Sequence, residues 1–310
     1  MTTTSSSATL LRRLDKIEQL AQAGRLRRLW HAPARYLWAL GFRTFVYART
    51  HRGKVCQTPT FFGVPMTVVL PAGTDIYLLG AKSHGSELRL ARFLIRELQP
   101  GQHFVDVGAH FGYFTLLAAQ LVGAAGSVRG FEAGSHTYAV LQDNVAGQAN
   151  VQIFHRAVSD KAEPVSFYEF PVQYNEFNSM HVGQFEQETW FGSFKPACTT
   201  VEAVSLDEAV YAAGPAPHII KIDVEGAEAQ VIRGAEHLLR QQAPLVILEY
   251  LAPARHNASH REAAALLAEL GYHPHRLDDA GRLQPCPDLE AFLLEQQLDS
   301  DNFVFKKTSA

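Results

Sequence analysis

The sequence is poor in cysteine and has no long apolar run. Its 310 residues include three widely separated cysteines, Cys56, Cys198 and Cys286. An odd number of isolated cysteines forms neither a zinc-binding Cys-x-x-Cys pair nor a disulfide framework. The longest mostly apolar stretch, residues 111–126, is shorter than the roughly 20 residues that a membrane-spanning helix needs. Because the N-terminus also lacks the apolar core of a secretory signal, we expect a cytoplasmic protein.

Two common nucleotide-binding motifs are missing as well. No Gly-Lys-Ser or Gly-Lys-Thr exists to form a Walker loop, and no Gly-x-Gly-x-x-Gly exists to form a dinucleotide fingerprint. The overall composition is nevertheless that of a folded protein, with 47% hydrophobic and 19% charged residues. These values exclude a collagen-like or wholly disordered chain.

Charge is distributed unevenly along the chain. Residues 1–54 contain eleven basic and two acidic residues, whereas the remainder contains 17 basic and 29 acidic residues. The pattern from Leu10 to about Arg49 is mostly helical, with breaks near Gly24 and Pro33. Such a segment either packs on the protein with its charges solvated, which we expect, or contacts an anionic membrane or a protein partner through residues 10–54. The second alternative would place the protein peripherally at a membrane surface.

Strands and helices alternate from His103 onward. Strands are predicted at residues 103–107, 127–131, 151–158, 218–222 and 244–250, with helices at 114–122, 137–146, 227–240 and 260–270. Alternation of this kind is typical of βαβ units and a parallel sheet. Residues 302–306 could form a last edge strand.

This pattern divides the chain into three parts. We predict a basic helical extension over residues 1–55, a lead-in hairpin and helix over 56–98, and a ligand-binding domain over 99–310. An irregular insertion at about 159–200 follows the third strand of that domain, and long insertions of this type often form lids or acceptor sites.

A glycine turn follows the first strand, in Phe104-Val-Asp-Val-Gly-Ala-His-Phe-Gly-Tyr-Phe114. Glycine allows a tight turn and a close ligand approach, and ligands bind beyond the carboxyl ends of such strands. Glu132 ends the second strand and can accept hydrogen bonds from ribose hydroxyls, whereas Asp106 could receive an ammonium group. A nucleoside joined to an amino acid, without phosphate, fits S-adenosylmethionine. The predicted cofactor residues are Asp106, Gly108, Ala109, His110, Gly112, Tyr113, Phe131, Glu132, Ala157 and Asp160.

Several motifs between residues 85 and 305 resemble the FkbM family of methyltransferases. They are Val-Asp-Val-Gly-Ala-His-Phe-Gly-Tyr-Phe-Thr (105–115), Gly-Phe-Glu-Ala (130–133), Leu-Gln-Asp-Asn-Val (141–145), Ala-Val-Ser-Asp (157–160), Val-Ser-Leu-Asp-Glu (204–208), Ile-Lys-Ile-Asp-Val-Glu-Gly-Ala-Glu (220–228) and Val-Ile-Leu-Glu (246–249). Where the family usually has Asn this chain has His110, and where it usually has Pro this chain has Ala133. The first difference bears on how the cofactor's tail is held.

The resemblance implies an α/β class I methyltransferase fold. We therefore expect a Rossmann-like, doubly wound, mostly parallel seven-stranded sheet with an N-terminal helical extension. The resemblance further implies methyl transfer to a hydroxyl group of a sugar, a polyketide, a lipid-linked compound or another secondary metabolite. The expected partner is thus a small-molecule or glycan acceptor.

Acidic residues follow the fourth and fifth strands, at the edge where an acceptor would bind. Methyl transfer to a hydroxyl needs positioning of the acceptor and benefits from a base. The predicted catalytic residues are Asp223, Glu225, Glu249 and, from the insertion, His181. Asp223 is the first candidate, and the alternative for it, as for Glu225, is capping of the following helix. A divalent metal could bind oxygen ligands here, but no spacing indicates one and no metal ligand is assigned.

Other functions stay open at this point. An NAD-dependent oxidoreductase could share the topology, although the central glycine of its fingerprint is missing. A non-catalytic module could bind partners through its basic segment. Nucleic-acid methylation is disfavoured because the main domain is acidic, whereas duplex binding relies on many phosphate contacts.

Overall fold

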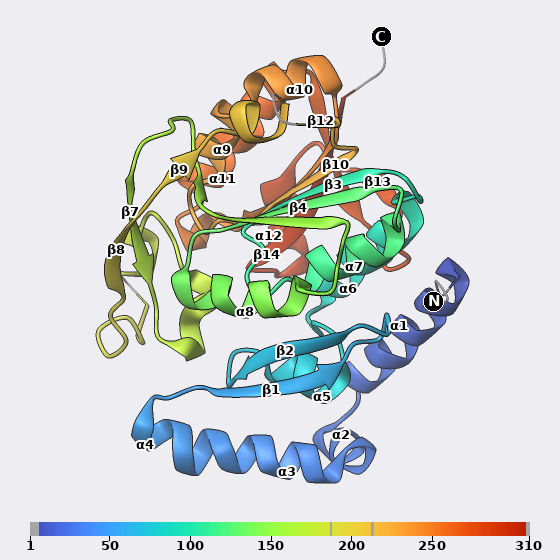
Figure 1. Cartoon of the computed structure of the whole chain (residues 1–310), viewed down its shortest axis with the longest axis vertical. Helices are drawn as coiled ribbons and strands as arrows, with labels where there is room; N and C mark the ends of the chain where they lie inside the picture. Colours follow the sequence, from blue (N-terminus) through green and yellow to red (C-terminus); the bar gives the residue numbers. More distant parts are fainter. Residues whose placement is uncertain (1–5, 187, 212–213, 308–310) are drawn as a thin grey trace.

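A mixed eight-stranded sheet forms the centre of the molecule in a computed structural model that describes residues 6–186, 188–211 and 214–307. Its order is β13-β12-β14-β11-β10-β3-β4-β5 (Figure 1). The strands are β3 (His103–Val107), β4 (Ser127–Glu132), β5 (Val151–His155), β10 (Ile219–Ile222), β11 (Leu245–Leu251), β12 (Tyr272–Leu277), β13 (Leu283–Pro285) and β14 (Ser300–Lys307). The five strands from β5 to β11 are parallel, and β14 runs antiparallel to both its neighbours. The three-residue β13 makes eight strands where seven were expected.

Helices cover both faces of the sheet, as a doubly wound fold requires (Figure 1). Their bounds are α6 (Gly85–Glu97), α7 (Tyr113–Val122) and α8 (Ser135–Val145) on one side, and α9 (Glu228–Arg233), α10 (Glu236–Gln242), α11 (Ala258–Glu269) and α12 (Leu289–Gln296) on the other. Each set packs its apolar residues into a separate core cluster. The helix predicted over 227–240 is two helices, α9 and α10, with Gly234 between them, where a Cβ would collide with the backbone of Ser159.

The last strand does not lie at the edge of the sheet. β14 pairs with β11 on one side and with β12 on the other, and Phe303, Val304 and Phe305 are fully buried. The expectation of an edge strand was wrong because β12 lies outside β14. The sequence of β12, Tyr272-His-Pro-His-Arg-Leu277, is polar and does not alternate, so no strand was predicted there. The sequence pattern also missed β13 and α12.

The insertion after the third strand folds into small pieces at one end of the sheet. The strand expected over 151–158 is split into β5 and β6, which are separated by Arg156. The elements between β5 and β10 are β6 (Ala157–Val158), β7 (Val165–Glu169), η2 (Val172–Phe177), η3 (Gly183–Phe185), β8 (Ala197–Val201), β9 (Ala203–Val204) and η4 (Asp207–Tyr211). A further short helix, η5 (Pro253–Arg255), follows β11. β6 pairs with β9, and β7 with β8. In the segment that connects β7 to β8, the rings of Tyr174 and Trp190 stack with their centroids 4.3 Å apart.

The basic N-terminal segment is helical, with the predicted breaks near Gly24 and Pro33. It consists of α1 (Ser7–Ala21), α2 (Arg25–His31), α3 (Pro33–Gly41), the π-helix η1 (Phe42–Tyr47) and α4 (Ala48–Thr50), and the lead-in of β1 (Lys54–Pro59), β2 (Pro65–Leu70) and α5 (Thr74–Leu79) follows. α1 packs on the domain as expected, since Leu10, Leu14 and Ile17 are buried. Arg92 of α6 pairs with Asp15 and with Glu18 of α1. Within the described ranges, no helix has the length and apolar character needed to cross a membrane.

Candidate active site

A cavity of about 570 Å³ lies at the carboxyl ends of the central parallel strands. This is the edge at which doubly wound sheets bind ligands, and the volume falls in the range of roughly 300–1,000 Å³ that is typical of ligand pockets. Three parts of the chain line it: the strand ends, residues 72–87 of the lead-in, and residues 175–180 of the insertion. The site thus combines segments that are far apart in the sequence.

The glycine turn after β3 is held tightly against the end of β4. The N–H groups of Gly108 and Ala109 both donate to the carbonyl of Phe131 at 2.9 Å, and the N–H of His110 donates to Glu132 Oε2 at 2.7 Å. Gly108 has φ +79°, and a Cβ there would collide with the carbonyl oxygen of Asp223. Only glycine therefore lets this turn pass so close to the loop after β10.

Glu132 is buried and organises the turn that it follows. Its carboxylate accepts hydrogen bonds from the N–H groups of His110 and Gly134 and from Thr137 Oγ1, at 2.7, 2.8 and 2.7 Å. Burial raises the pKa of this carboxyl although these bonds oppose the shift. Because an ionised carboxylate has about four acceptor sites, one is left for a ligand hydroxyl in the cavity that Glu132 lines.

Half of the predicted cofactor residues line the cavity. Those that do are Gly108, His110, Phe131, Glu132 and Ala157. Those that do not are Asp106, Ala109, Gly112, Tyr113 and Asp160. Local reasoning identified the correct turn but could not separate its inward-facing from its outward-facing side chains.

Asp106 illustrates the difference. Its side chain is buried, accepts a hydrogen bond from Thr115 Oγ1 at 2.7 Å and lies 3.8 Å from Lys221 Nζ. The carboxylate therefore joins β3 to α7 and β10, and the expectation that it receives the cofactor's ammonium group finds no geometric support. Tyr113 likewise packs its ring on Phe62 and Phe114. Asp160 is exposed and accepts a hydrogen bond from Ser159 Oγ.

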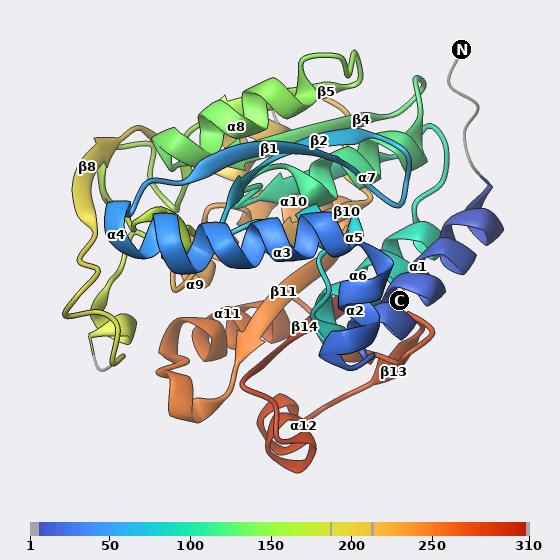
Figure 2. The same ribbon diagram turned by 90° about the horizontal axis from the view of Figure 1, so that it is seen from below.

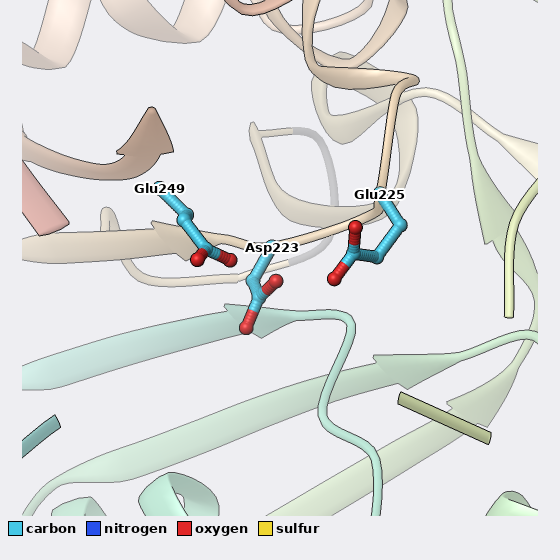
Figure 3. Close-up of side chains that lie close together, drawn as sticks. All are labelled: Asp223, Glu225 and Glu249. Carbon is cyan, nitrogen blue, oxygen red and sulfur yellow. The ribbon is translucent and has the colours of Figure 1, made fainter. Parts of the chain in front are cut away.

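Three of the four predicted catalytic residues converge at the other end of the cavity. Asp223 follows β10, Glu225 lies in the next turn and Glu249 lies in β11. Figure 3 shows their carboxylates turned toward one another, and each offers an oxygen within 4.8 Å of the others. Oxygen donors at this spacing could hold a divalent cation. Lys221, however, already neutralises Asp223 through an ion pair of 2.9 Å.

Burial and neighbouring charges give these carboxyls very different acidities. Burial opposes ionisation of Asp223, yet Lys221 and Lys82 lower its pKa to about 2. Burial and repulsion by Asp223 raise the pKa of Glu249 to about 8. Burial and repulsion by Glu249 raise the pKa of Glu225 well above its usual value. At neutral pH, Asp223 is therefore ionised and Glu249 is mostly protonated.

Helix capping does not describe the side chain of Asp223. Helix α9 begins only at Glu228, and the carboxylate of Asp223 bonds Lys221 rather than a helical N–H. Glu228 does have a structural role, because its Oε1 accepts from the N–H of Gly226 at 3.0 Å.

His181 does not join the site. It is exposed, and its Nε2 lies 2.9 Å from Gln230 Oε1. The preceding residue, Met180, lines the cavity instead. The insertion is fixed in this orientation by Ser179 and Gln184, whose side chains both donate to the carbonyl of Glu225. The structure therefore does not bring His181 together with the three carboxyls, because its side chain is exposed outside the cavity.

The insertion also contacts the cofactor turn. His110 Nε2 lies 3.0 Å from Asn175 Oδ1, and burial and the nearby Lys82 lower the pKa of His110 to about 4. His110 is therefore neutral near pH 7. It stands where the FkbM pattern usually has Asn, and here it joins the turn to the insertion.

Sequence reasoning missed the contribution of the lead-in segment. Lys82 forms an ion pair of 2.8 Å with Glu87, and both line the cavity together with Asp75. Glu176 from the insertion is a further acidic residue of the wall. The polar run Lys82-Ser-His-Gly-Ser-Glu87 before an apolar helix was the available signal, but nothing local shows that it faces a cavity.

The cavity suits a cationic ligand without phosphate. Its described walls contain seven carboxyl groups and two basic side chains, Lys82 and Arg156. A sulfonium and an ammonium group match this balance. A pyrophosphate would need free N–H groups at the turn. Here the N–H groups of Gly108, Ala109 and His110 are already bonded to protein oxygens.

The fold and the site define a class I methyltransferase that depends on S-adenosylmethionine. The strand order β5-β4-β3-β10-β11-β14-β12, with only β14 reversed among these seven, is the arrangement of that class. The chain belongs to the FkbM methyltransferase family, since the Methyltransferase FkbM domain matches residues 106–274, more than half of its length. This membership sets aside the oxidoreductase and the non-catalytic module.

Solved structures with a similar fold are distant in sequence. A methyltransferase FkbM from Methylobacillus flagellatus is 12% identical with a TM-score of 0.40, over 96% of this chain and 60% of that one. An S-adenosylmethionine-dependent O-methyltransferase from Thermotoga maritima is 12% identical with a TM-score of 0.40, over 83% and 79%. Aeropyrum pernix fibrillarin, solved with natively bound S-adenosyl-L-methionine, is 12% identical with a TM-score of 0.40, over 70% and 74%. A search of curated proteins found no match.

Proposed function

We propose that this methyltransferase acts on a hydroxyl oxygen of a small-molecule or glycan acceptor: a sugar, a polyketide, a lipid-linked compound or another secondary metabolite. The observation that supports this most is the carboxyl of Glu249, which lies beside Asp223 in the cavity and has a pKa of about 8. A hydroxyl is a weak nucleophile that benefits from a base, whereas an amine would need none once it is neutral.

Glu249 is a better base than the first candidate, Asp223. A general base works best when its pKa lies near the working pH. The pKa of Asp223, about 2, makes it a weak proton acceptor, and its ion pair with Lys221 occupies one of its oxygens. We therefore assign proton acceptance to Glu249 and orientation of the acceptor hydroxyl to Asp223.

The other residues hold the reactants in line. S-adenosylmethionine, when bound, supplies an electrophilic methyl group on a sulfonium centre. Gly108 and Glu132 would hold its nucleoside, and the acidic wall would favour its positive charges. The acceptor would then lie between this group and the carboxylates, with its oxygen directed by Asp223. Positioning of this kind supplies a large part of the rate enhancement in a displacement between two bound reactants.

The insertion provides the surface for the rest of the acceptor. A groove of about 370 Å³ is lined by Arg43, Tyr174, Phe177 and Trp190, and it shares Ala72, Glu176 and Phe177 with the main cavity. The ring centroids of Phe177 and Trp190 lie 5.2 Å apart with planes only 15° from parallel. Flat aromatic faces of this kind suit the apolar face of a sugar ring or a polyketide chain.

A labelled-methyl screen tests the proposal. The protein is incubated with tritium-labelled S-adenosylmethionine and panels of glycosides, sugar nucleotides, polyketides and lipid-linked sugars, and NMR identifies the methylated atom of any product. We expect an O-methyl group and its loss in Glu249→Gln. The matched control, Glu236→Gln, changes an exposed glutamate that pairs with Arg240. A methyl group on nitrogen or carbon, or full turnover in Glu249→Gln, would contradict the proposal.

A further inference from the structure

The helices after α1 expose an apolar face to solvent. Six large apolar residues of α2, α3 and η1 are exposed, namely Trp30, Leu37, Trp38, Leu40, Phe45 and Val46. Trp30 is 81% exposed, Phe45 65% and Leu37 59%. Across the rest of the described chain, only Val55, Tyr211 and Leu294 are comparable. Apolar exposure is therefore concentrated on this one face, which we call the outer helical face (residues 30–48).

The spacing shows that this exposure follows the helix. Pro33, Leu37, Leu40, Thr44 and Ala48 recur every three or four residues, which places them along one side, and all of them are exposed. A helix that serves only to cover a core shows the opposite arrangement, with its apolar stripe turned inward. Helix α1 is of that kind, because its stripe is buried against α6.

Contacts on the inner side fix the orientation of these helices. Ala39 and Tyr47 are buried. Arg35 donates to Thr58 Oγ1 at 3.2 Å, and the hydroxyl of Tyr47 accepts from the N–H of Gln173 at 3.1 Å. The helical run from α3 to α4 is therefore held against β1 and the insertion, and it lies along one side of the molecule (Figures 1 and 2). The outer helical face is a fixed feature rather than a detached tail.

The charge around this face has one sign. Between Glu18 and Asp75 the sequence contains eight basic residues and no acidic one. Arg27, Arg43 and Arg49 in these helices are exposed. The remainder of the chain after residue 54 has a net charge of −12. A partner that matches this face must be anionic and must also offer an apolar layer to Trp30, Leu37 and Phe45.

We propose that the outer helical face docks on an anionic lipid bilayer, with its apolar side chains in the interface and its arginines at the headgroups. An amphipathic helix with basic flanks lies in the plane of the membrane and buries its apolar face at the boundary between headgroups and acyl chains. Tryptophan favours that depth. The helical run of residues 33–50 is roughly 27 Å long at 1.5 Å per residue, which suits a flat surface better than a compact binding site.

The outer helical face lies close to the groove that we assign to the acceptor. Arg43 of η1 lines the groove that shares Ala72, Glu176 and Phe177 with the main cavity. A bilayer on the outer helical face would therefore lie next to the groove on the acceptor side. The docking itself does not depend on which acceptor is methylated, so it can be tested separately from the proposed O-methylation.

Vesicle sedimentation of the full-length protein tests the proposal. The probes are vesicles of phosphatidylcholine alone and of phosphatidylcholine mixed with phosphatidylglycerol. We expect binding to the anionic vesicles at least about tenfold tighter than to the neutral ones, weakening as salt rises. Phe45→Asp and the pair Arg27→Glu with Arg49→Glu should each weaken binding at least about tenfold.

Two control variants make the same chemical changes elsewhere. Leu294→Asp alters a side chain on α12 that is 79% exposed, and Lys306→Glu reverses an exposed charge on β14. Both should bind vesicles like the wild type. Phe45→Asp should keep wild-type affinity for S-adenosylhomocysteine, which shows that the domain is folded. Tryptophan fluorescence should shift to the blue on anionic vesicles, and Trp30→Phe should reduce that shift.

Three results would overturn the proposal. The first is no sedimentation with anionic vesicles. The second is equal loss of binding in the controls and in Phe45→Asp. The third is a dimer in light scattering that Phe45→Asp dissociates, with no vesicle binding, which would make the outer helical face an interface between two copies of the chain.

Discussion

The two ends of the cavity are built on opposite principles. At the cofactor end, the carboxylate of Glu132 is bonded to His110, Gly134 and Thr137. At the other end, Asp223, Glu225 and Glu249 face one another, and burial together with mutual repulsion raises the pKa values of Glu225 and Glu249. Hydrogen bonds hold the first end in shape, whereas at the second end burial and repulsion oppose ionisation, so that the carboxyl of Glu249 titrates near neutral pH.

The largest expected effect lies at the acceptor end. Glu249→Gln keeps the shape of the side chain but cannot accept a proton, so turnover should fall by about 10²–10⁴-fold. Affinity for S-adenosylhomocysteine should stay unchanged in calorimetry, because Glu249 belongs to the other end of the cavity. A loss of affinity as large as the loss of turnover would show that the two ends are not separate.

The converse change at the cofactor end should act on binding. Glu132→Ala removes the acceptor for the ribose hydroxyls and for the turn, so affinity for S-adenosylhomocysteine should fall by about 10–100-fold, as expected for hydrogen bonds to a charged group. At the other end of the cavity, Asp223→Asn should mainly lower turnover. If the Glu132 variant bound S-adenosylhomocysteine as tightly as the wild type, the ribose assignment would be wrong.

The pH dependence of turnover should report the same carboxyl. Because the pKa of Glu249 is raised to about 8, its ionised fraction grows about tenfold per pH unit below that value. The rate should therefore rise with pH and level off above about 8. In Glu249→Gln the residual rate should lack this rise, and a profile shared by both proteins would assign the titration to another group.

The smallest effect should appear in stability. The folded pKa of Glu249 is above its unfolded value, so the folded protein retains this proton more strongly. Its contribution to stability is complete below about pH 4.5 and is lost as pH rises through about 8. Melting curves should therefore show the stability of Glu249→Gln rising relative to that of the wild type between about pH 4.5 and about pH 8. A difference in stability that does not change with pH would mean that the pKa of Glu249 is the same in the folded and the unfolded protein.

The cofactor end was largely predictable because its parts are close in sequence. Residues 104–114 form a strand, a turn and the start of a helix, and such a turn indicates its ligand edge directly. The sequence did not predict the direction in which individual side chains point. Asp106 and Tyr113 lie in the correct segment, yet both are directed into the core.

The acceptor end was predictable only in part. Asp223 follows one strand and Glu249 lies near the end of the next, and the alternation pattern placed both strands in one parallel sheet, whose strands end at one edge. Lys82 and Glu87 were not predicted, because the lead-in segment reaches the cavity only after the chain has folded back on the sheet. His181 was expected in the site but lies outside the cavity that Met180 lines, since the insertion has no periodicity that could tell the two orientations apart.

By itself the sequence determined the alternating strands and helices, the glycine turn and the acidic strand ends, because these depend on local backbone preferences and on periodicity. Tertiary structure alone decided which carboxyl has a pKa near neutrality and which apolar face is exposed. Burial and the distances between Lys221, Asp223 and Glu249 set the pKa values of the carboxyls. The apolar stripe of α1 is buried because α1 packs against α6, whereas α3 makes contacts only along its inner side and leaves its outer apolar residues exposed.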